Sequence, residues 1–215
     1  MDATSKPLAD QAFDGLLTAL RGGQLASSGF FSMPELSRQL GYPIAAIREA
    51  TKLAAARGLL TILPKRGITV MDSGSETART CMDMRAALER EGARRMIVGG
   101  KDFPVESLRE THRDLLEKAR AGAPSATGRR AIEIDLSLHN ALSDGLDNRY
   151  LRQAYAENRD RIAVIQQSRP FLQDRIMSAM EEHLQIIAAM EARDLPGVVK
   201  AIDVHLAQTL RWWGV

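Results

Sequence analysis

The chain has 215 residues, of which 45% are hydrophobic and 26% are charged, a composition typical of a folded protein with one large domain or two ordinary ones. The formal net charge of +2 lies entirely within residues 1–72 and is too small to indicate nucleic-acid binding by itself, so contacts with DNA would depend on local clusters of basic residues. A single cysteine, Cys81, excludes an intrachain disulfide, and the sequence has neither a signal peptide nor the ~20 apolar residues that span a membrane, so we predict a cytoplasmic protein without a membrane partner.

A supporting helix follows a short N-terminal tail. Apolar residues recur at helical spacing over residues 8–20, and residues 23–31 are expected to form a loop. The next helix is predicted over Met33–Leu40, because Ser32 is a favourable N-cap and Gly41 supplies the stop.

Another helix and a hairpin come next. The helix is predicted over residues 43–57, and its buried face is expected to hold Ile47, Ala50, Leu53 and Ala54. Two β-rich runs, 59–63 and 68–70, flank a glycine-containing turn, which predicts a hairpin. Helix, turn, helix and hairpin outline a winged helix-turn-helix, whose second helix enters the major groove of DNA.

Three pieces of this region occur in order: Ile-Arg-Glu-Ala over 47–50, Arg-Gly-Leu-Leu over 57–60 and Pro-Lys-Arg-Gly-Ile-Thr-Val over 64–70. Together they resemble the N-terminal domain of the GntR family of bacterial transcription regulators. The resemblance implies a homodimer that binds a double-stranded DNA operator, as a repressor of a metabolic operon. The residues expected to contact DNA are Arg38, Arg48, Thr51, Lys52, Lys65, Arg66 and Gly67.

The start of the recognition helix departs from that family. It reads Pro43-Ile44-Ala45-Ala46, where such regulators usually carry Ser-Arg-Thr-Pro. Ile44 and the two alanines offer no hydrogen-bonding group to the edge of a base. The departure keeps an alternative open: a metal-dependent enzyme or small-molecule binder that has lost operator recognition.

The second part of the chain reads as helical throughout. A hinge over residues 73–77 is expected to separate a winged helix-turn-helix domain, 1–72, from an all-helical domain, 78–215. Helices are predicted at about 76–99, 103–121, 129–144, 148–167, 170–192 and 195–213. The predicted fold is therefore mainly α: an N-terminal winged helix-turn-helix followed by a six- to seven-helix antiparallel bundle.

Histidines in this bundle point to a metal site. Asp135 and His139 are four residues apart and share one helix face, while His183 and His205 lie on the last two helices. Side chains from three helices of a bundle can meet at one point. By spacing alone the signal is weak, because an isolated histidine is more often a structural residue.

A second family resemblance supports the prediction of a metal site. Arg85-Ala-Ala-Leu-Glu89, Asp135-Leu-Ser-Leu-His139 and Asn148 are similar to the signatures of the FCD-type branch of the GntR family. The resemblance implies that Asp135, His139, His183 and His205 ligate a divalent metal ion, and such a donor set suits Zn²⁺, Ni²⁺, Fe²⁺ or Mn²⁺.

The ion is expected to hold the bundle together and to dock a small carboxylate effector, so we predict a regulator without catalytic residues rather than an enzyme. Arg85 is expected to clamp the effector, and the alternative for Arg85 is an intrahelical ion pair with Glu89. His112 is expected on the surface, and Glu181 and Glu182 are expected to be a solvated pair of charges.

Overall fold

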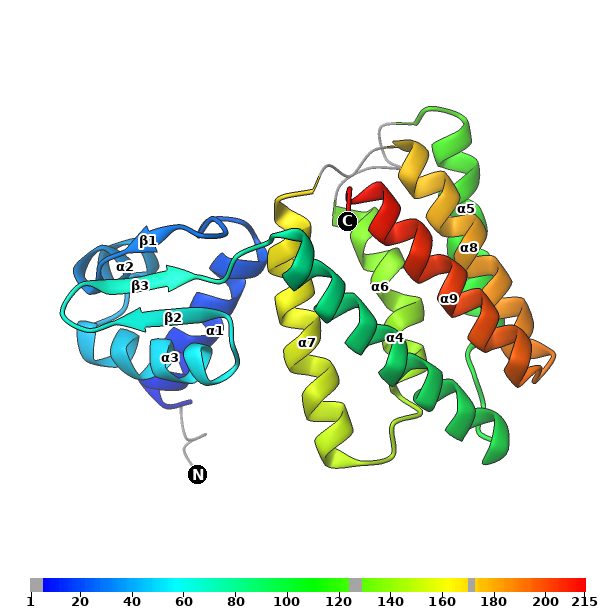
Figure 1. The fold of residues 1–215 in the computed structure, drawn as a ribbon, viewed down its shortest axis with the longest axis horizontal. Helices are drawn as coiled ribbons and strands as arrows, with labels where there is room; N and C mark the ends of the chain where they lie inside the picture. The colour runs from blue at the N-terminus through cyan, green and yellow to red at the C-terminus, as the bar shows by residue number, and fades with distance from the viewer. Residues whose placement is uncertain (1–5, 124–128, 170–172) are drawn as a thin grey trace, which may run out of the picture. The chain divides into compact units, whose positions relative to one another are not determined.

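A computed structural model describes residues 6–123, 129–169 and 173–215. Contacts divide the chain into two compact units, the first formed by Met1–Thr77 with Arg159–Arg169 and the second by Ala78–Asn158 with Pro170–Val215. Helices dominate the described residues, which confirms the predicted mainly α class (Figure 1). The predicted boundary over residues 73–77 stays a prediction about domain organisation.

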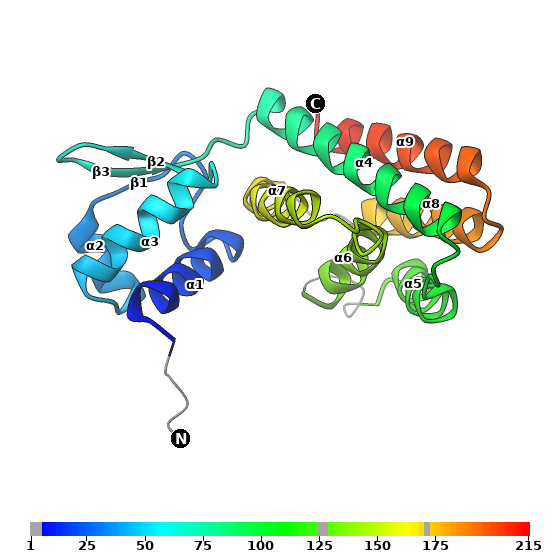
Figure 2. The ribbon, with the colours of Figure 1, turned by 90° about the horizontal axis from the view of Figure 1, so that it is seen from below.

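The first unit is a winged helix-turn-helix. Three antiparallel strands in the order β1-β3-β2 lie on one side of the unit and its three N-terminal helices on the other (Figure 2). The elements are α1 (Leu8–Arg21), β1 (Phe30–Phe31), α2 (Met33–Leu40), α3 (Ile44–Ala56), β2 (Leu60–Leu63) and β3 (Gly67–Val70).

Local sequence explains where α2 begins and ends. The Ser32 hydroxyl accepts a hydrogen bond from the backbone N–H of Glu35, and the Glu35 carboxylate accepts one from the backbone N–H of Ser32, both over 3.3 Å. Gly41 takes a left-handed conformation, with φ of 74°, and ends the helix. The predicted bounds of α2 are confirmed.

Strand β1 was not expected, because residues 23–31 read as a loop. Phe30 pairs with Thr69 and Phe31 pairs with Ile68. Two residues are too few to show the alternation that predicts a strand, so β1 is recognised only by its pairing with β3. Gly67 makes this pairing possible, since a Cβ there would lie 2.2 Å from the carbonyl oxygen of Phe31.

The core of the first unit confirms most of the predicted apolar faces. Leu53 is the exception: its side chain is 40% exposed, although it was expected on the buried face of α3. Thr51 is buried in this helix instead. The fully buried apolar residues include Leu16, Leu36, Ile47, Leu59 and Ile68.

The end of α7 (Arg149–Gln167) belongs to the first unit, a feature that the sequence did not reveal. Val164 joins the core of this unit. The Asp160 carboxylate pairs with Arg21, and Arg161 Nε donates to the backbone oxygen of Arg57 over 3.0 Å. Residues 159–169 therefore hold the winged unit by both apolar and charged contacts.

The second unit consists of helices. Besides α7 these are α4 (Ser75–Val98), α5 (Val105–Arg120), α6 (Arg129–Ser143), α8 (Gln173–Glu191) and α9 (Leu195–Trp212). Helix α8 packs against both α5 and α9 (Figure 1). All six helices lie within a few residues of their predicted bounds. No helix in the described part of the chain combines the length and the apolarity that a bilayer span requires.

Helices α4 and α6 touch through their backbones. A Cβ on Gly92 would lie 2.1 Å from the carbonyl oxygen of Leu142, and a Cβ on Gly145 would lie 2.1 Å from that of Gly92. Glycine at both positions lets the two helices approach closely. Near this contact, Glu89 of α4 lies beside His139 of α6, with Oε1 of Glu89 3.0 Å from Nδ1 of His139.

Candidate metal centre

Three helices each contribute one histidine to a buried cluster. His139 lies on α6, His183 on α8 and His205 on α9, and one ring nitrogen from each lies within 4.8 Å of the others. All three residues are at most 3% exposed. The sequence could suggest this meeting only through the bundle fold, because the residues are far apart along the chain.

Asp135 completes the predicted set. Its Oδ1 lies 3.7 Å from Nε2 of His183, and that nitrogen lies 3.4 Å from Nε2 of His205. The ring centroids of His139 and His183 are 4.9 Å apart. The structure thus brings the three predicted histidine ligands within 4.8 Å of one another and places Asp135 beside His183, while ligation itself stays a proposal.

Burial keeps the imidazoles neutral. Burial, together with the smaller effect of the nearby Arg85 guanidinium, lowers the pKa of His139 to about 3. Burial also lowers the pKa of His205 to about 3, although the hydrogen bond to Glu182 acts in the opposite direction. The pKa of His183 lies well below its ordinary value because of burial and the neighbouring His205. Neutral imidazoles carry the lone pairs that a metal ion needs.

Several ring nitrogens in this region lack a hydrogen bond. Both nitrogens of His139 and Nδ1 of His183 are buried without such a partner. A buried polar atom left unpaired costs about 1–3 kcal/mol. Three neutral imidazoles and one carboxylate are donors that fit a divalent metal ion, so the donor types agree with those expected from the sequence.

Carboxylates stand behind two of the imidazoles. The Glu182 Oε2 lies 2.7 Å from Nδ1 of His205, which donates to it, so Nε2 is the nitrogen with the lone pair and faces the cluster. The Glu89 Oε1 lies 3.0 Å from Nδ1 of His139, close enough to pair although the angle is not that of a hydrogen bond. Burial raises the pKa of Glu89 to about 7, against the opposing effects of Arg85 and Tyr155.

The expectation for Glu182 was wrong. Instead of being solvated, this carboxylate also accepts from Arg175 Nη1 over 2.9 and 3.1 Å. Glu181 is exposed, as expected, and pairs with Arg120 over 2.7 Å. Adjacent residues on one helix point to different surroundings, and only the position of α9 decides which of them meets a histidine.

Arg85 makes the intrahelical contact that was the alternative to an effector clamp. Its Nε lies 3.6 Å from Glu89 Oε1, and its Nη2 lies 3.2 Å from Nε2 of His205. The side chain is only 8% exposed. Its guanidinium therefore borders the histidine cluster, and a role in binding an effector stays a prediction.

His112 was expected on the surface and is completely buried. Its ring centroid lies 5.2 Å from that of His183. The apolar spacing of α5 gave the only available signal, since Leu108, His112 and Leu115 share one face of that helix and all three are buried.

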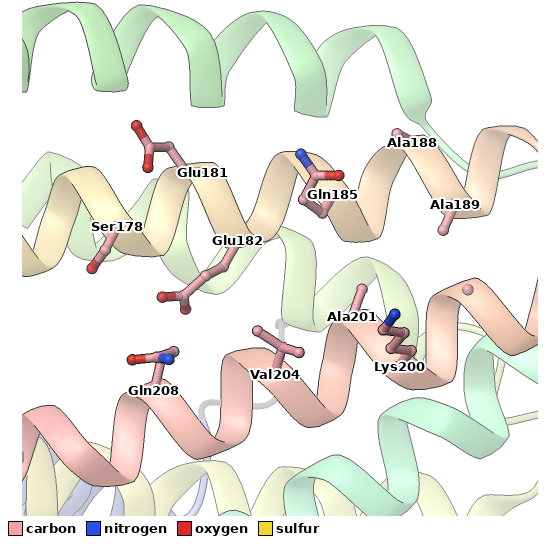
Figure 3. A pocket seen from close by; sticks show the side chains of 11 residues that line it. Ser178, Glu181, Glu182, Gln185, Ala188, Ala189, Lys200, Ala201, Val204 and Gln208 are labelled. Carbon is pink, nitrogen blue, oxygen red and sulfur yellow. The ribbon is translucent and has the colours of Figure 1, made fainter.

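A groove of about 780 Å³ runs along the outer side of α8 and α9. Figure 3 shows Glu182 extending from α8 toward α9, near Gln208 and Val204. Because Glu182 also holds His205, this side chain connects the wall of the groove to the histidine cluster.

Most residues expected to contact DNA are exposed on the first unit. Arg48 and Lys52 lie on α3 and Arg38 on α2, while Lys65 and Arg66 lie in the turn between β2 and β3. The Lys52 ammonium pairs with Glu49 over 2.8 Å.

Two of the residues expected to contact DNA are buried instead. Thr51 has no exposed surface, and its hydroxyl donates to the backbone oxygen of Arg48 over 3.0 Å. Gly67 is also buried, where it accommodates β1. The expectation of direct contact is therefore corrected for both, because packing in the winged unit occupies them.

Acid is expected to destabilise the metal-free protein. Above pH 6.5 the histidines are neutral in both the folded and the unfolded protein. Below pH 6.5 they become protonated in the unfolded protein, whereas in the folded protein His139 and His205 become protonated only near pH 3. Their lowered pKa values therefore contribute stability to the folded state that is present above pH 6.5 and is lost as the pH falls toward 3. Glu89 acts oppositely, since its raised pKa favours the folded state below pH 7.

Between pH 6.5 and 4.5 two histidines outweigh the one carboxyl group. The free energy of unfolding, measured by urea titration in the presence of a chelator, should decrease from pH 7 to pH 5. A constant or increasing value would contradict the neutral, buried state of the cluster.

Comparisons with known proteins cover nearly the whole chain. The FCD domain family matches residues 80–208. Curated protein sequences give no match. Among solved structures, E. coli McbR/YncC has a TM-score of 0.71 at 17% identity, covering 96% of each chain. A transcriptional regulator GntR from Rhodococcus sp. RHA1 has a TM-score of 0.72 at 16% identity, covering 96% of this chain and 98% of that one.

Listeria monocytogenes Lar, described as controlling the expression of the agr system, has a TM-score of 0.62 at 13% identity, with 96% of each chain covered. At these identities the structural likeness shows the fold. Both units of the chain are included in it, the winged unit and the helical unit alike.

Proposed function

Because this chain belongs to the FCD family and has the fold of GntR-family transcription regulators, we propose that it is a ligand-responsive, DNA-binding transcription regulator. The observation that carries the proposal is the exposed basic surface of the winged unit. Arg48 and Lys52 project from the unpacked side of α3, and Lys65 and Arg66 extend the same kind of charge to the wing. Such side chains supply phosphate and base contacts when a recognition helix enters the major groove.

The regulator would act as a cytoplasmic homodimer on a palindromic operator, as a repressor of a metabolic operon. Two recognition helices related by a two-fold axis match the symmetry of such a site. An effector would control the protein only if its affinity differs between the states that do and do not bind DNA.

The helical unit would hold a divalent metal ion and a small organic acid. Asp135, His139, His183 and His205 would bind the ion, which supplies a positive charge that docks a carboxylate. Arg85 borders the same cluster and could pair with the far end of that acid. The ion would bind and orient the organic acid, so the proposal requires no catalytic residue.

A gel-shift experiment tests this function. The full-length protein is titrated onto DNA from upstream of its own operon, at one stated salt concentration, with and without a chelator. Retardation of the upstream DNA that persists in the presence of unrelated competitor DNA would support the proposal. Equal affinity for the upstream and unrelated DNA would contradict it.

Replacing Arg48 with alanine should weaken specific binding by about 1–3 kcal/mol if this side chain contacts a base. The reason is its exposed position on α3, away from the core of the winged unit. Dissociation constants for the upstream DNA are compared at fixed salt. Arg94→Ala is a suitable control, since Arg94 is an exposed arginine of the helical unit whose partner is Glu91. If Arg48→Ala binds as tightly as the control, Arg48 does not read the operator.

One observation favours the second candidate, a metal-dependent enzyme or small-molecule binder without operator recognition. Ile44 is 39% exposed and Ala45 is exposed at the start of the recognition helix, where polar contacts with bases would be expected. Tight metal binding combined with no preference for any upstream DNA would select this candidate.

A further inference from the structure

We propose that His112 is a positioning residue of the metal centre: its Nε2 accepts a hydrogen bond from the Nδ1–H of His183 and so directs Nε2 of His183 to the ion. This inference rests on the proposed metal site but adds a residue outside the predicted ligand set. It assigns a role to a buried imidazole that neither the packing nor the four expected ligands explain.

The hydrogen bonding of His112 defines which of its nitrogens is an acceptor. Nδ1 lies 2.7 Å from the carbonyl oxygen of Leu108, one turn earlier on α5. A carbonyl oxygen can only accept, so Nδ1 carries the proton and donates it. Nε2 then holds a lone pair, and it is buried without a partner.

His183 has the complementary deficiency. Its Nε2 faces the cluster, 3.4 Å from Nε2 of His205 and 3.7 Å from the Asp135 carboxylate. Its Nδ1 is buried without a hydrogen bond. When Nε2 binds a metal ion, the ring proton has to lie on Nδ1, and a buried N–H requires an acceptor.

The distance between the rings suits a bond between these two atoms. A ring nitrogen lies about 1.1 Å from the imidazole centroid and a hydrogen bond spans about 3 Å, so two bonded rings have centroids about 5 Å apart. The centroids of His112 and His183 are 5.2 Å apart, with the ring planes tilted by 59°. The two nitrogens are not hydrogen-bonded to each other in this structure, so the proposed bond requires a change in the orientation of the rings.

A carboxylate lies beside Nδ1 of each of the other two imidazoles of the cluster, and in His205 it accepts a hydrogen bond. Glu182 stands behind Nδ1 of His205 and Glu89 stands behind Nδ1 of His139. Histidine ligands of metal ions almost always donate their second N–H to an outer partner. With His112 behind His183, each of the three histidines has an outer partner, and His112 is a neutral partner whereas the other two are carboxyl groups.

A neutral partner has a consequence for the protonation of His183. Without metal, the proton of His183 can lie on Nε2, which is 3.4 Å from Nε2 of His205, although that acceptor also receives a contact from Nη2 of Arg85 at 3.2 Å. Metal binding would move that proton to Nδ1, where His112 accepts it. The tautomer of His183 therefore changes on metal binding.

Metal affinity of two His112 variants of the full-length protein tests the proposal. His112→Phe keeps the ring volume and removes the acceptor, whereas His112→Gln places an amide oxygen near the position of Nε2. Zn²⁺ affinity is measured by competition with a chromophoric chelator. We expect a loss of about 10–100-fold for His112→Phe and most of the affinity to return in His112→Gln.

Equal Zn²⁺ affinity of His112→Phe and the unsubstituted protein would overturn the proposal. A loss of equal size in both variants would also overturn it, because the acceptor would then not be the cause. If the unsubstituted protein itself binds no Zn²⁺, the metal centre of the proposed function fails, which is a distinguishable result.

Nitrogen-15 spectra of the unsubstituted protein give a test that does not depend on folding of a variant. In the Zn²⁺-loaded protein, His183 should carry its proton on Nδ1 and His112 should show a hydrogen-bonded, unprotonated Nε2. A His112 ring whose Nε2 signal is unchanged by Zn²⁺ would contradict the bond.

Discussion

His183→Ala is expected to reduce the affinity for divalent metal ions by more than about 100-fold, the upper end of the loss seen when only an outer partner is removed. His183 is the central member of the cluster: its ring contacts those of His112, His139 and His205, and its Nε2 also faces Asp135. Removing it eliminates one ligand and leaves the others without a common neighbour. Competition with a chelator and elemental analysis of the purified protein measure the loss.

The same variant should lose the stabilisation that metal binding gives. A ligand that binds only the folded state raises its free energy of unfolding, so Zn²⁺ should raise the melting temperature of the unsubstituted protein. It should not do so for His183→Ala. Glu181→Ala is the matched control, because Glu181 lies on the same helix with an exposed side chain that pairs with Arg120. A Zn²⁺-dependent shift of the same size in His183→Ala would rule out this cluster as the metal site.

Gly92→Ala is expected to lower the free energy of unfolding of the helical unit by about 3 kcal/mol, the upper part of the usual range for overpacking. The added Cβ would lie 2.1 Å from the carbonyl oxygen of Leu142. That atom belongs to the backbone of α6 and cannot rotate away as the end of a flexible side chain does. The two helices would have to separate, and urea unfolding followed by circular dichroism measures the cost.

Separation of α4 and α6 should also weaken metal binding, since α6 carries Asp135 and His139 while α4 carries Glu89. Gly74→Ala serves as the control: Gly74 is exposed, and the nearest atom to an added Cβ is a side-chain oxygen of Asp72 at 3.0 Å. Equal stability of the two variants would contradict a close backbone contact between α4 and α6.

Local patterns in the sequence predicted the elements well, because helix periodicity, N-caps and stops act over a few residues. The bounds of α2 and of all six bundle helices follow from such signals. Strand β1 did not follow, since Phe30 and Phe31 become a strand only through β3. Leu53 is exposed and Thr51 is buried for a similar reason, because the contact with α2 decides which side of α3 is covered. On that side the Thr51 hydroxyl lies 4.0 Å from the sulfur of Met33.

The candidate metal centre could also be predicted only in part from the sequence. The Asp135-x-x-x-His139 spacing and the presence of later histidines could be read from the chain, and the family resemblance joined them into one set. Their outer partners could not be read. Glu182 and Glu181 are identical in type and adjacent, yet only Glu182 meets His205. His112 looked like a surface residue because a single histidine gives no indication of which helix will cover it.

The order of the helices and of the hairpin, and the residue types able to bind a metal ion, were thus properties of the sequence alone. Each of these depends on neighbours within one or two helical turns, or on a motif shared with a family. The tertiary structure alone decided that His139, His183 and His205 meet, that Glu89, Glu182 and His112 stand behind them, and that Thr51 and Gly67 are covered. The physical reason is that burial and hydrogen bonding between helices depend on which distant surfaces pack together, and no spacing within a single helix contains that information.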